Sequence, residues 1–275
     1  MKKIIVITGG TGGIGHAVAI AFARQGAEII FQGRDAEKGR KIASELSKIN
    51  GSTATFIAAD VSTIDGIKFL AMEIKKLTNK IDVLIHSTGI FNPERHVTKD
   101  GFYESFTVNY LCKFMLDHLL LEELKNAGGR VIIVGVQLMK NAVINFDDMQ
   151  MRANYSFMKS RSQNMLAVHM HAQEFSKRYN SIPINIINPG FVKTGIYRNL
   201  KGSMKFMMRV IELFVGNSSD KAIVNILELA KTDSCQSGYF YPTVAKPAAQ
   251  VKINLDASVA SKLWDESIML GKLNE

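Results

Sequence analysis

The sequence predicts a single α/β domain in which helices cover both faces of a doubly wound parallel sheet. Short runs rich in Ile and Val, each bounded by turn residues, alternate with longer segments in which apolar residues recur at helical spacing. The strand-like runs are almost continuously apolar, as is typical of strands that are buried on both faces. No linker or repeat divides residues 1–275, so we expect one domain.

Six strands and the helices between them are expected. The strands are expected at 4–8, 28–32, 53–59, 81–87, 130–135 and 182–189. The helices are expected at 15–26, 36–50, 65–78, 103–125 and 154–178. A helix between successive strands returns the chain to the same edge of the sheet, which is what parallel pairing requires.

The segment at about 191–220 carries the weakest pattern and follows the last of these strands. Its stretch "SMKFMMRVIELFVG" (203–216) is amphipathic and rich in Met, a side chain that adapts to irregular ligands. We expect a lid over the substrate here. A simple surface helix is the alternative, and the basic residues would also permit weak association with an anionic membrane surface.

Charge, cysteines and hydropathy exclude several classes of protein. The net charge is +9, but Lys and Arg are dispersed without interleaved aromatic residues, so we expect no nucleic-acid partner. The two cysteines, Cys112 and Cys235, have no metal-ligand partners at a familiar spacing, so neither a metal site nor a disulfide is expected. This cysteine usage favours a reducing, cytoplasmic location. No stretch reaches the roughly 18 apolar residues of a bilayer-spanning helix, so no membrane insertion is expected.

A glycine-rich turn predicts the phosphate site of a dinucleotide. In "IIVITGGTGGIGHAVAIAFARQG" (4–26), five glycines join the first strand to the first helix. Glycines let the backbone approach a diphosphate, and the helix N-terminus offers free N–H groups with a partial positive charge. The expected contacts are Gly9, Thr11, Gly13, Ile14 and Gly15. The alternative is a tight turn that binds no ligand.

The end of the second strand indicates which dinucleotide binds. The sequence there reads "FQGRD" (31–35), with Gly33 at the place where an acid would accept hydrogen bonds from a free ribose 2′-hydroxyl. Gly33 leaves space, and Arg34 supplies a planar cation suited to a 2′-phosphate. The sequence therefore favours NADP(H) over NAD(H) as the cofactor. A solvated arginine at a strand end is the alternative.

The ordered motifs resemble those of the short-chain dehydrogenase/reductase family over nearly the whole chain. "TGGTGGIG" (8–15) is similar to the family's T-G-x-x-x-G-I-G, and Tyr155 and Lys159 match its Y-x-x-x-K pair. "NPGFVKT" (188–194) resembles its P-G-x-x-x-T segment. The stretch "NFDDM" and the tail "ASKLWDESIMLGKL" are most similar to the retinol-dehydrogenase branch.

The resemblance implies a Rossmann fold, and it implies a role for each matching residue. The implied cofactor contacts beyond the glycine turn are Asp60, Val61, Gly89, Lys159, Pro189, Gly190 and Thr194. Tyr155 would exchange a proton with the substrate oxygen, Lys159 would lower the pKa of that tyrosine and bind the nicotinamide ribose, and Asn109 would hold a relay water. On a helix, Tyr155 and Lys159 would share one face because they are four residues apart.

The sequence departs from the family in two places. The catalytic serine after the fifth strand is absent, because "RVIIVGVQLMK" (130–140) presents Gly135 and Val136 there. Gln137 is a candidate substitute, since its amide can donate a hydrogen bond; an ordinary exposed glutamine is the alternative. The family's N-N-A-G reads "HSTG" (86–89), which retains the glycine, Gly89.

The residues and the resemblance together predict an NADP(H)-dependent oxidoreductase that acts on a small lipophilic alcohol, carbonyl or enone. The absent serine keeps an alternative open, which is a non-redox enzyme of the same fold or an NADP-bound regulatory or scaffold protein with impaired dehydrogenase activity. Family members commonly pair through the helices that here hold Asn109 and Tyr155. The resemblance therefore implies a homodimer or homotetramer.

Overall fold

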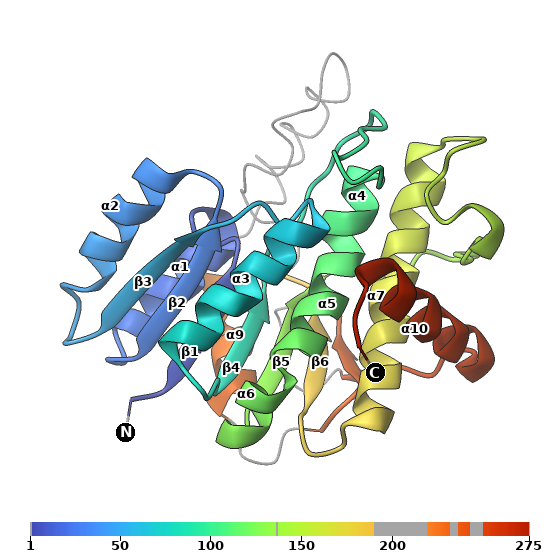
Figure 1. The fold of residues 1–275 in the computed structure, drawn as a ribbon. Helices are drawn as coiled ribbons and strands as arrows, with labels where there is room; N and C mark the ends of the chain where they lie inside the picture. Colours follow the sequence, from blue (N-terminus) through green and yellow to red (C-terminus); the bar gives the residue numbers. More distant parts are fainter. Residues whose placement is uncertain (1, 136, 190–218, 232–235, 243–249, 275) are drawn as a thin grey trace.

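A single sheet runs through the middle of the molecule in this computed structural model (Figure 1). The structure describes residues 2–135, 137–189, 219–231, 236–242 and 250–274. Within these residues the sheet has eight strands in the order β3-β2-β1-β4-β5-β6-β7-β8. All neighbouring strands pair in parallel except β7 and β8, which are antiparallel. This is the single-domain, Rossmann-like α/β fold that the sequence predicts.

The six expected strands are present, and every end lies within two residues of its expected limit. They are β1 (Ile4–Thr8), β2 (Glu28–Gly33), β3 (Thr53–Ala58), β4 (Val83–His86), β5 (Arg130–Val134) and β6 (Ile184–Ile187). Two further strands, β7 (Tyr239–Tyr241) and β8 (Val251–Lys252), extend the sheet beyond β6. They are too short to show the periodicity from which a strand is recognised.

Helices cover both faces because successive side chains of each strand point to opposite sides. The helices are α1 (Gly13–Ala23), α2 (Ala36–Leu46), α3 (Ile64–Leu77), α5 (Cys112–Leu119), α6 (Leu121–Ala127), α7 (Phe157–Arg178), α9 (Ser219–Lys231) and α10 (Ala257–Gly271). In β1, Ile5 and Ile7 enter the core beneath α1, α2 and α9, whereas Val6 enters the core beneath α3, α5 and α7. The sheet is therefore buried on both faces, as its continuous apolar runs predict.

The expected helix at 103–125 is divided into several pieces. It consists of a short turn α4 (Glu104–Phe106), a π-helical segment η1 (Thr107–Leu111), α5 and α6. The chain leaves helical geometry at Leu120, where φ is −105° and ψ is 18°. π-Helical segments are uncommon and occur frequently at functional sites, and η1 holds Asn109.

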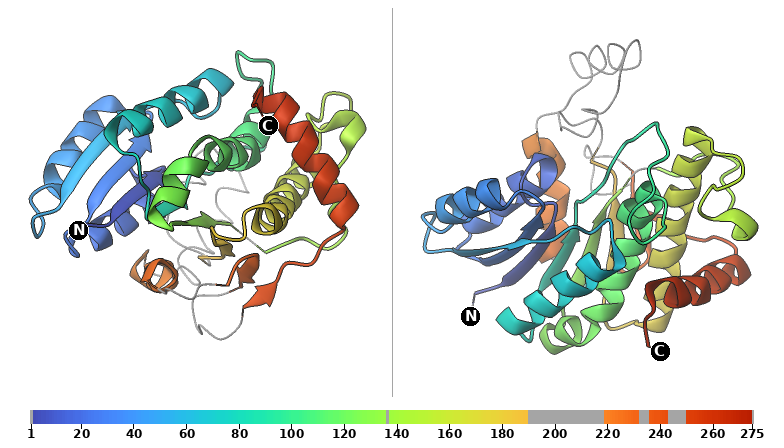
Figure 2. Two further views of the ribbon diagram at one scale, coloured as in Figure 1. Left: turned by 60° about the horizontal axis from the view of Figure 1, so that its bottom comes forward. Right: turned by 45° about the horizontal axis from the view of Figure 1, so that its top comes forward.

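The C-terminal helix α10 packs across α7, on the side of the sheet opposite to α9 (Figure 2). Its Trp264 packs against Phe114 of α5 and His171 of α7, with ring centroids 4.9 and 5.8 Å apart. The Ser267 hydroxyl lies 2.6 Å from the Tyr110 hydroxyl in η1. None of the helices in the described ranges combines the length and the apolar character needed to cross a membrane.

Candidate functional site

A cavity of about 870 Å³ opens at the carboxyl edge of the sheet. It is lined by the loops that follow β1, β2, β3, β4, β5 and β6 and by residues of η1, α5 and α7. The strand order places β1 beside β4, so the loops that leave these two strands diverge toward opposite sides of the sheet. Ligands of open α/β sheets bind in the crevice that forms at such a point.

The glycine turn after β1 forms one wall of this cavity. Gly9 and Gly13 have φ values of +73° and +52°, which L side chains rarely adopt. The buried Gln32 fixes the turn, since its Oε1 accepts from the Gly9 amide at 3.0 Å and its Nε2 donates to the Ala59 carbonyl at 2.6 Å. A Cβ atom on Gly33 would lie 2.5 Å from Thr11 Cγ2. The glycines at 9 and 33 therefore allow β1 and β2 to end close together.

Four of the five expected phosphate contacts line the cavity, namely Gly9, Thr11, Gly13 and Ile14. Gly15 does not, because it packs beneath the turn, where a Cβ atom would lie 2.5 Å from the Gly9 carbonyl oxygen. No side chain caps α1, whose N-cap residue is Gly12. The amide groups of its first turn thus have no side-chain acceptor, which suits an anionic ligand.

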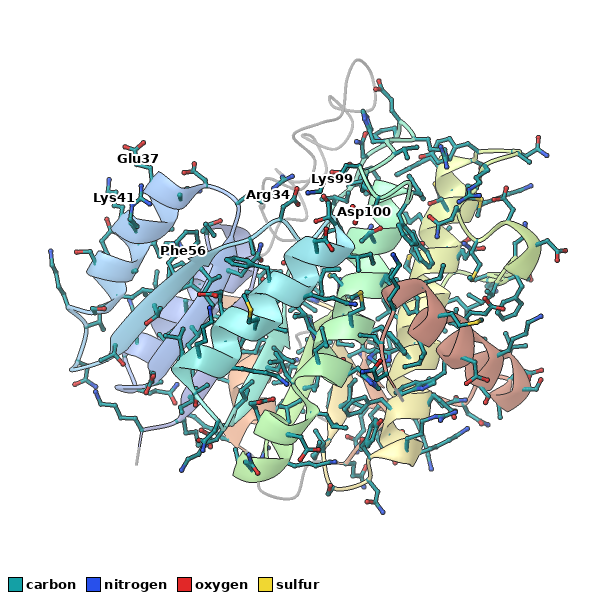
Figure 3. The ribbon with its side chains drawn as sticks, in the orientation of Figure 1. Arg34, Glu37, Lys41, Phe56, Lys99 and Asp100 are labelled. Atoms are coloured by element: carbon teal, nitrogen blue, oxygen red, sulfur yellow. The ribbon has the colours of Figure 1, made fainter. Side chains whose placement is uncertain are left out.

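Two basic side chains line one end of the cavity, the end that β2 and α2 form. Arg34 and Lys38 both line it and are both exposed, and Figure 3 shows Arg34 at the upper end of β2. The sequence indicates Arg34, but Lys38 is identified only by the structure, where Asp35 caps α2 through the Lys38 amide at 3.0 Å. Asp60 and Val61, expected at the adenine, line the same end.

At the other end, Asn109 fixes the loop that follows Gly89. Its Oδ1 accepts from the Ile90 amide at 2.8 Å, and its Nδ2 donates to the Ile90 carbonyl at 3.0 Å. Gly89, Asn109 and Pro189 all line the cavity, as their expected roles require. That Asn109 holds a relay water stays a prediction.

Lys113, one helical turn beyond Asn109, is a lining residue that the sequence does not indicate. It is only 4% exposed, and its Nζ donates to the carbonyls of Thr88 and Val108 at 3.0 and 3.1 Å. Burial lowers the pKa of this amine, and the neighbouring Cys112 and Asp117 partly offset that effect. A lysine of this kind releases its proton more readily than an exposed one.

The structure contradicts the expectation that Tyr155 and Lys159 share a helix face toward the cofactor. Helix α7 begins at Phe157 after the N-cap Ser156, so Tyr155 lies outside the helix. Its hydroxyl donates to the Pro93 carbonyl at 3.0 Å and therefore accepts from the Tyr103 hydroxyl at 3.1 Å. Tyr155 does not line the cavity, and Lys159 is exposed and does not line it either.

Burial and the hydrogen bond with Tyr103 also raise the pKa of Tyr155 above its usual value. That is the opposite of the shift that proton transfer near neutral pH requires. No ion pair or hydrogen bond joins Tyr155 to Lys159 within the described part of the chain. The geometry thus gives no support to the proton-transfer role expected of this pair.

The face of α7 that meets the cavity is offset by two residues from the expected one. Arg161, Asn164, Met165 and Val168 line the cavity at helical spacing, and Phe157 extends the same stripe one turn earlier. Because each residue turns a helix by about 100°, a residue two positions away lies about 200° around it. The pair four residues apart on this face is therefore Phe157 and Arg161. Both contact Phe91, Phe157 by its ring at 4.7 Å and Arg161 by its guanidinium at 4.9 Å.

Several buried polar atoms along the cavity find no hydrogen-bond partner among the described residues. They are Thr88 Oγ1, both amide atoms of Asn164 and His169 Nε2. A buried polar group without a partner costs about 1–3 kcal/mol, so such groups indicate that a polar ligand or water belongs beside them. The cavity therefore suits a dinucleotide, with a glycine-lined turn and cations at one end and unsatisfied polar atoms at the other.

Some expected residues cannot be placed in the cavity. Val136, Gly190 and Thr194 lie outside the described residues, as does the expected lid except for its last two positions, which begin α9. Gln137 is exposed and does not line the cavity, which favours the ordinary surface glutamine over a substitute for the serine. Over the described ranges, no group of three His, Cys, Asp or Glu is arranged to hold a metal ion.

Behind the cavity wall lies a buried network of two histidines and one aspartate. Asp117 of α5 accepts from His86 Nε2 and His171 Nε2, each at 2.7 Å, and all three side chains are at most 1% exposed. Burial alone would raise the pKa of Asp117, but the two imidazoles lower it below its usual value. His86, which stands at the first position of the family's N-N-A-G, therefore pairs with a residue of α5.

The chain is similar to known dehydrogenases over almost its whole length. The family described as short chain dehydrogenase matches residues 3–205. A human polyprenol dehydrogenase is 26% identical over 96% of this chain and 84% of its own length. Human retinol dehydrogenase 14 is 28% identical over 98% of this chain and 86% of its own length.

Solved structures give the same fold. The structure of an alcohol dehydrogenase from the archaeon Thermococcus sibiricus, complexed with 5-hydroxy-NADP, has a TM-score of 0.68 and 20% sequence identity, and the match covers 88% of this chain and 95% of that one. The glycine turn, the strand order and the match over residues 3–205 lead to one conclusion. The chain belongs to the short-chain dehydrogenase/reductase family of oxidoreductases.

Proposed function

We propose that the chain is an NADP(H)-dependent oxidoreductase that interconverts a lipophilic alcohol and its carbonyl compound. The observation that carries this proposal is the cavity, which joins the glycine turn and the Arg34–Lys38 end to the Asn109–Lys113 end. A 2′-phosphate would bind between Arg34 and Lys38, whose charges suit it. The diphosphate would bind at the glycine turn, and the nicotinamide would then extend toward η1 and α7.

The lipophilic substrate is carried over from the relatives. Two of them are named polyprenol dehydrogenase and retinol dehydrogenase 14, and both names denote long apolar alcohols. The wall near α7 includes Met165 and Val168, which would pack against an apolar chain. NADP⁺ supplies the hydride acceptor for alcohol oxidation, and NADPH supplies the hydride for the reverse reaction.

Cofactor preference is tested by binding. NADPH at about 100 times its dissociation constant should raise the free energy of unfolding by about 2.7 kcal/mol, and NADH at the same concentration should raise it less. Arg34→Ala should weaken NADPH binding and leave NADH binding almost unchanged. Equal affinity of the wild-type protein for the two cofactors would contradict the NADP preference, and no stabilisation by either would contradict the proposed function.

A second candidate is an NADP(H)-bound regulatory protein without redox activity. It is favoured by the presence of Phe157 and Arg161 on the cavity face of α7, together with the absence of any Ser or Thr between Thr107 and Ser156. Single-turnover oxidation of bound NADPH, measured with a panel of lipophilic aldehydes and ketones, separates the two. Turnover of any member supports the oxidoreductase, and tight NADPH binding without turnover supports the regulatory protein.

A further inference from the structure

We propose that Lys113 is the group that exchanges the proton with the substrate oxygen in this cavity, the role that the resemblance assigns to a tyrosine. The inference rests on the proposed function and goes beyond it by naming the proton donor. It starts from the position of Lys113, which is buried in the cavity wall although it carries a charge when protonated.

The contacts of Lys113 leave part of its hydrogen-bonding capacity unused. An ammonium group has three hydrogens, and the two acceptors within reach are the carbonyls of Thr88 and Val108. Lys113 forms no ion pair with a carboxylate of the described residues. One hydrogen therefore remains for a ligand in the cavity that Lys113 lines.

The charges around Lys113 come from three elements. Cys112 and Asp117 lie on its own helix, and Asp117 is held by His86 of β4 and by His171 of α7. Arg161 of α7 also lines the cavity. Burial lowers the pKa of the Lys113 amine, while Cys112 and Asp117 raise it in part. Lys113 therefore gives up its proton more readily than an exposed lysine does, while its two carbonyl contacts hold the protonated amine in place.

The other ionisable groups at this end of the described cavity are poorly suited to proton donation. Arg161 cannot lose its proton in a protein. His169 has its pKa lowered by burial to about 4, so its imidazole is neutral at pH 7. Its Nδ1 faces the Met165 carbonyl at 2.9 Å and must carry the hydrogen, which makes Nε2 an acceptor. Lys113 is the remaining group.

The proposed step balances. In reduction, hydride from NADPH forms the new C–H bond at the carbonyl carbon, and the C=O π electrons move to oxygen. The resulting alkoxide takes a proton from the Lys113 ammonium, so the products are the alcohol, NADP⁺ and a neutral amine. The amine regains its proton from solvent. Oxidation of the alcohol runs through the same steps in reverse.

The first test needs no substrate. Calorimetric titration with NADP⁺ in buffers of different ionisation enthalpy, between pH 6 and 10, measures the protons released on binding. The nicotinamide ring of NADP⁺ carries a positive charge and would lie at the Lys113 end of the cavity, so it should lower the pKa of this amine, and the wild-type protein should release protons at some pH in this range. Lys113→Met should abolish this release, and Lys41→Met, which replaces an exposed lysine on α2, should not. Release that persists in Lys113→Met would overturn the proposal.

The second test separates the proton of Lys113 from its charge. Lys113→Arg keeps a cation that cannot release a proton, whereas Lys113→Met removes both. Each should lower the single-turnover rate of NADPH oxidation by about 10²–10⁴-fold, the usual contribution of a general acid. The dissociation constant for NADPH should change less in Lys113→Arg than in Lys113→Met. A full rate in either variant, or a comparable loss of rate in Lys159→Met, would overturn the role of Lys113.

The two tests also distinguish this inference from the proposed function on which it rests. Absence of NADP⁺ binding in the wild-type protein would defeat both. Wild-type binding or turnover that is indifferent to Lys113 would defeat this inference alone. Circular dichroism and thermal unfolding of each variant show that the fold is retained, and the arginine variant, which keeps the charge, covers the case in which the methionine variant fails to fold.

Discussion

At His169, burial and one hydrogen bond determine both the charge and the tautomer of a side chain. The residue is 2% exposed, and burial lowers its pKa to about 4. Because a carbonyl can only accept, the contact with the Met165 carbonyl places the hydrogen on Nδ1. The neutral ring therefore keeps a bare lone pair on Nε2, which is buried and has no hydrogen-bond partner among the described residues. An alcohol hydroxyl is the kind of group that would pair with it.

The same burial makes stability depend on pH. The unfolded chain binds a proton at His169 near pH 6.5, whereas the folded chain resists protonation until about pH 4. The contribution of His169 to the free energy of unfolding is therefore complete above pH 6.5. It falls by about 3 kcal/mol as the pH drops to 4. We expect His169→Gln to flatten this part of the curve, measured by urea unfolding between pH 7 and 4. An unchanged slope would contradict the assignment.

At the scale of one element, the start of α7 decides which side chains meet the cavity. Helical periodicity gives the spacing of residues on a face, but it does not fix where the helix begins. Ser156 holds the N-cap position, with its Oγ 3.5 Å from the Lys159 amide, and serine is a preferred residue there. That serine is the sequence signal that would have excluded Tyr155 from the helix.

This offset gives a test by gain of function. The double variant Phe157→Tyr/Arg161→Lys places a phenol and an amine four residues apart on the face that lines the cavity. We expect single-turnover carbonyl reduction to become faster, because a phenol beside an ammonium has a lowered pKa. The matched control, Met158→Tyr/Ser162→Lys, carries the same two side chains at the same spacing, one position later, at residues that do not line the cavity. A gain equal to that of the control would argue against the assigned face.

The sequence predicts the sheet well and the site only in part, and both outcomes have physical reasons. Strands such as β1 and β5 are buried on both faces, so their composition alone reveals them. The glycine turn and Arg34 are local signals, and the structure places both at the cavity. Lys113 is different, because nothing in a helix sequence shows that one particular lysine faces inward. Its burial depends on how α5 packs beside Thr88, which is a tertiary contact.

At the scale of the whole molecule, α10 covers the surface through which the resemblance implies pairing. Trp264 and Ser267 contact α5, η1 and α7, and Arg178 of α7 places its guanidinium 4.8 Å from the Trp264 ring. Pairing through α5 and α7 would require α10 to be displaced. The homodimer or homotetramer that the resemblance implies stays a prediction. In this structure α10 obstructs an interface formed by α5 and α7.

We therefore expect the purified protein not to associate through α5 and α7. Light scattering coupled to gel filtration should give the mass of one chain. A stable dimer would prompt chemical crosslinking, and crosslinks between the α7 helices of two copies would contradict this expectation. In a separate measurement, Trp264→Ala should lower the free energy of unfolding by about 3–5 kcal/mol, because removal of the indole leaves a cavity between packed helices.

The sequence contains one tryptophan, and that residue is the 5%-exposed Trp264. Its ring lies between α5 and α7. Intrinsic tryptophan fluorescence therefore reports only whether α10 is packed against these two helices. Emission should shift to the red when the helix detaches, even while the rest of the sheet stays intact. Tryptophan fluorescence thus provides a direct measurement of the release of the C-terminal helix.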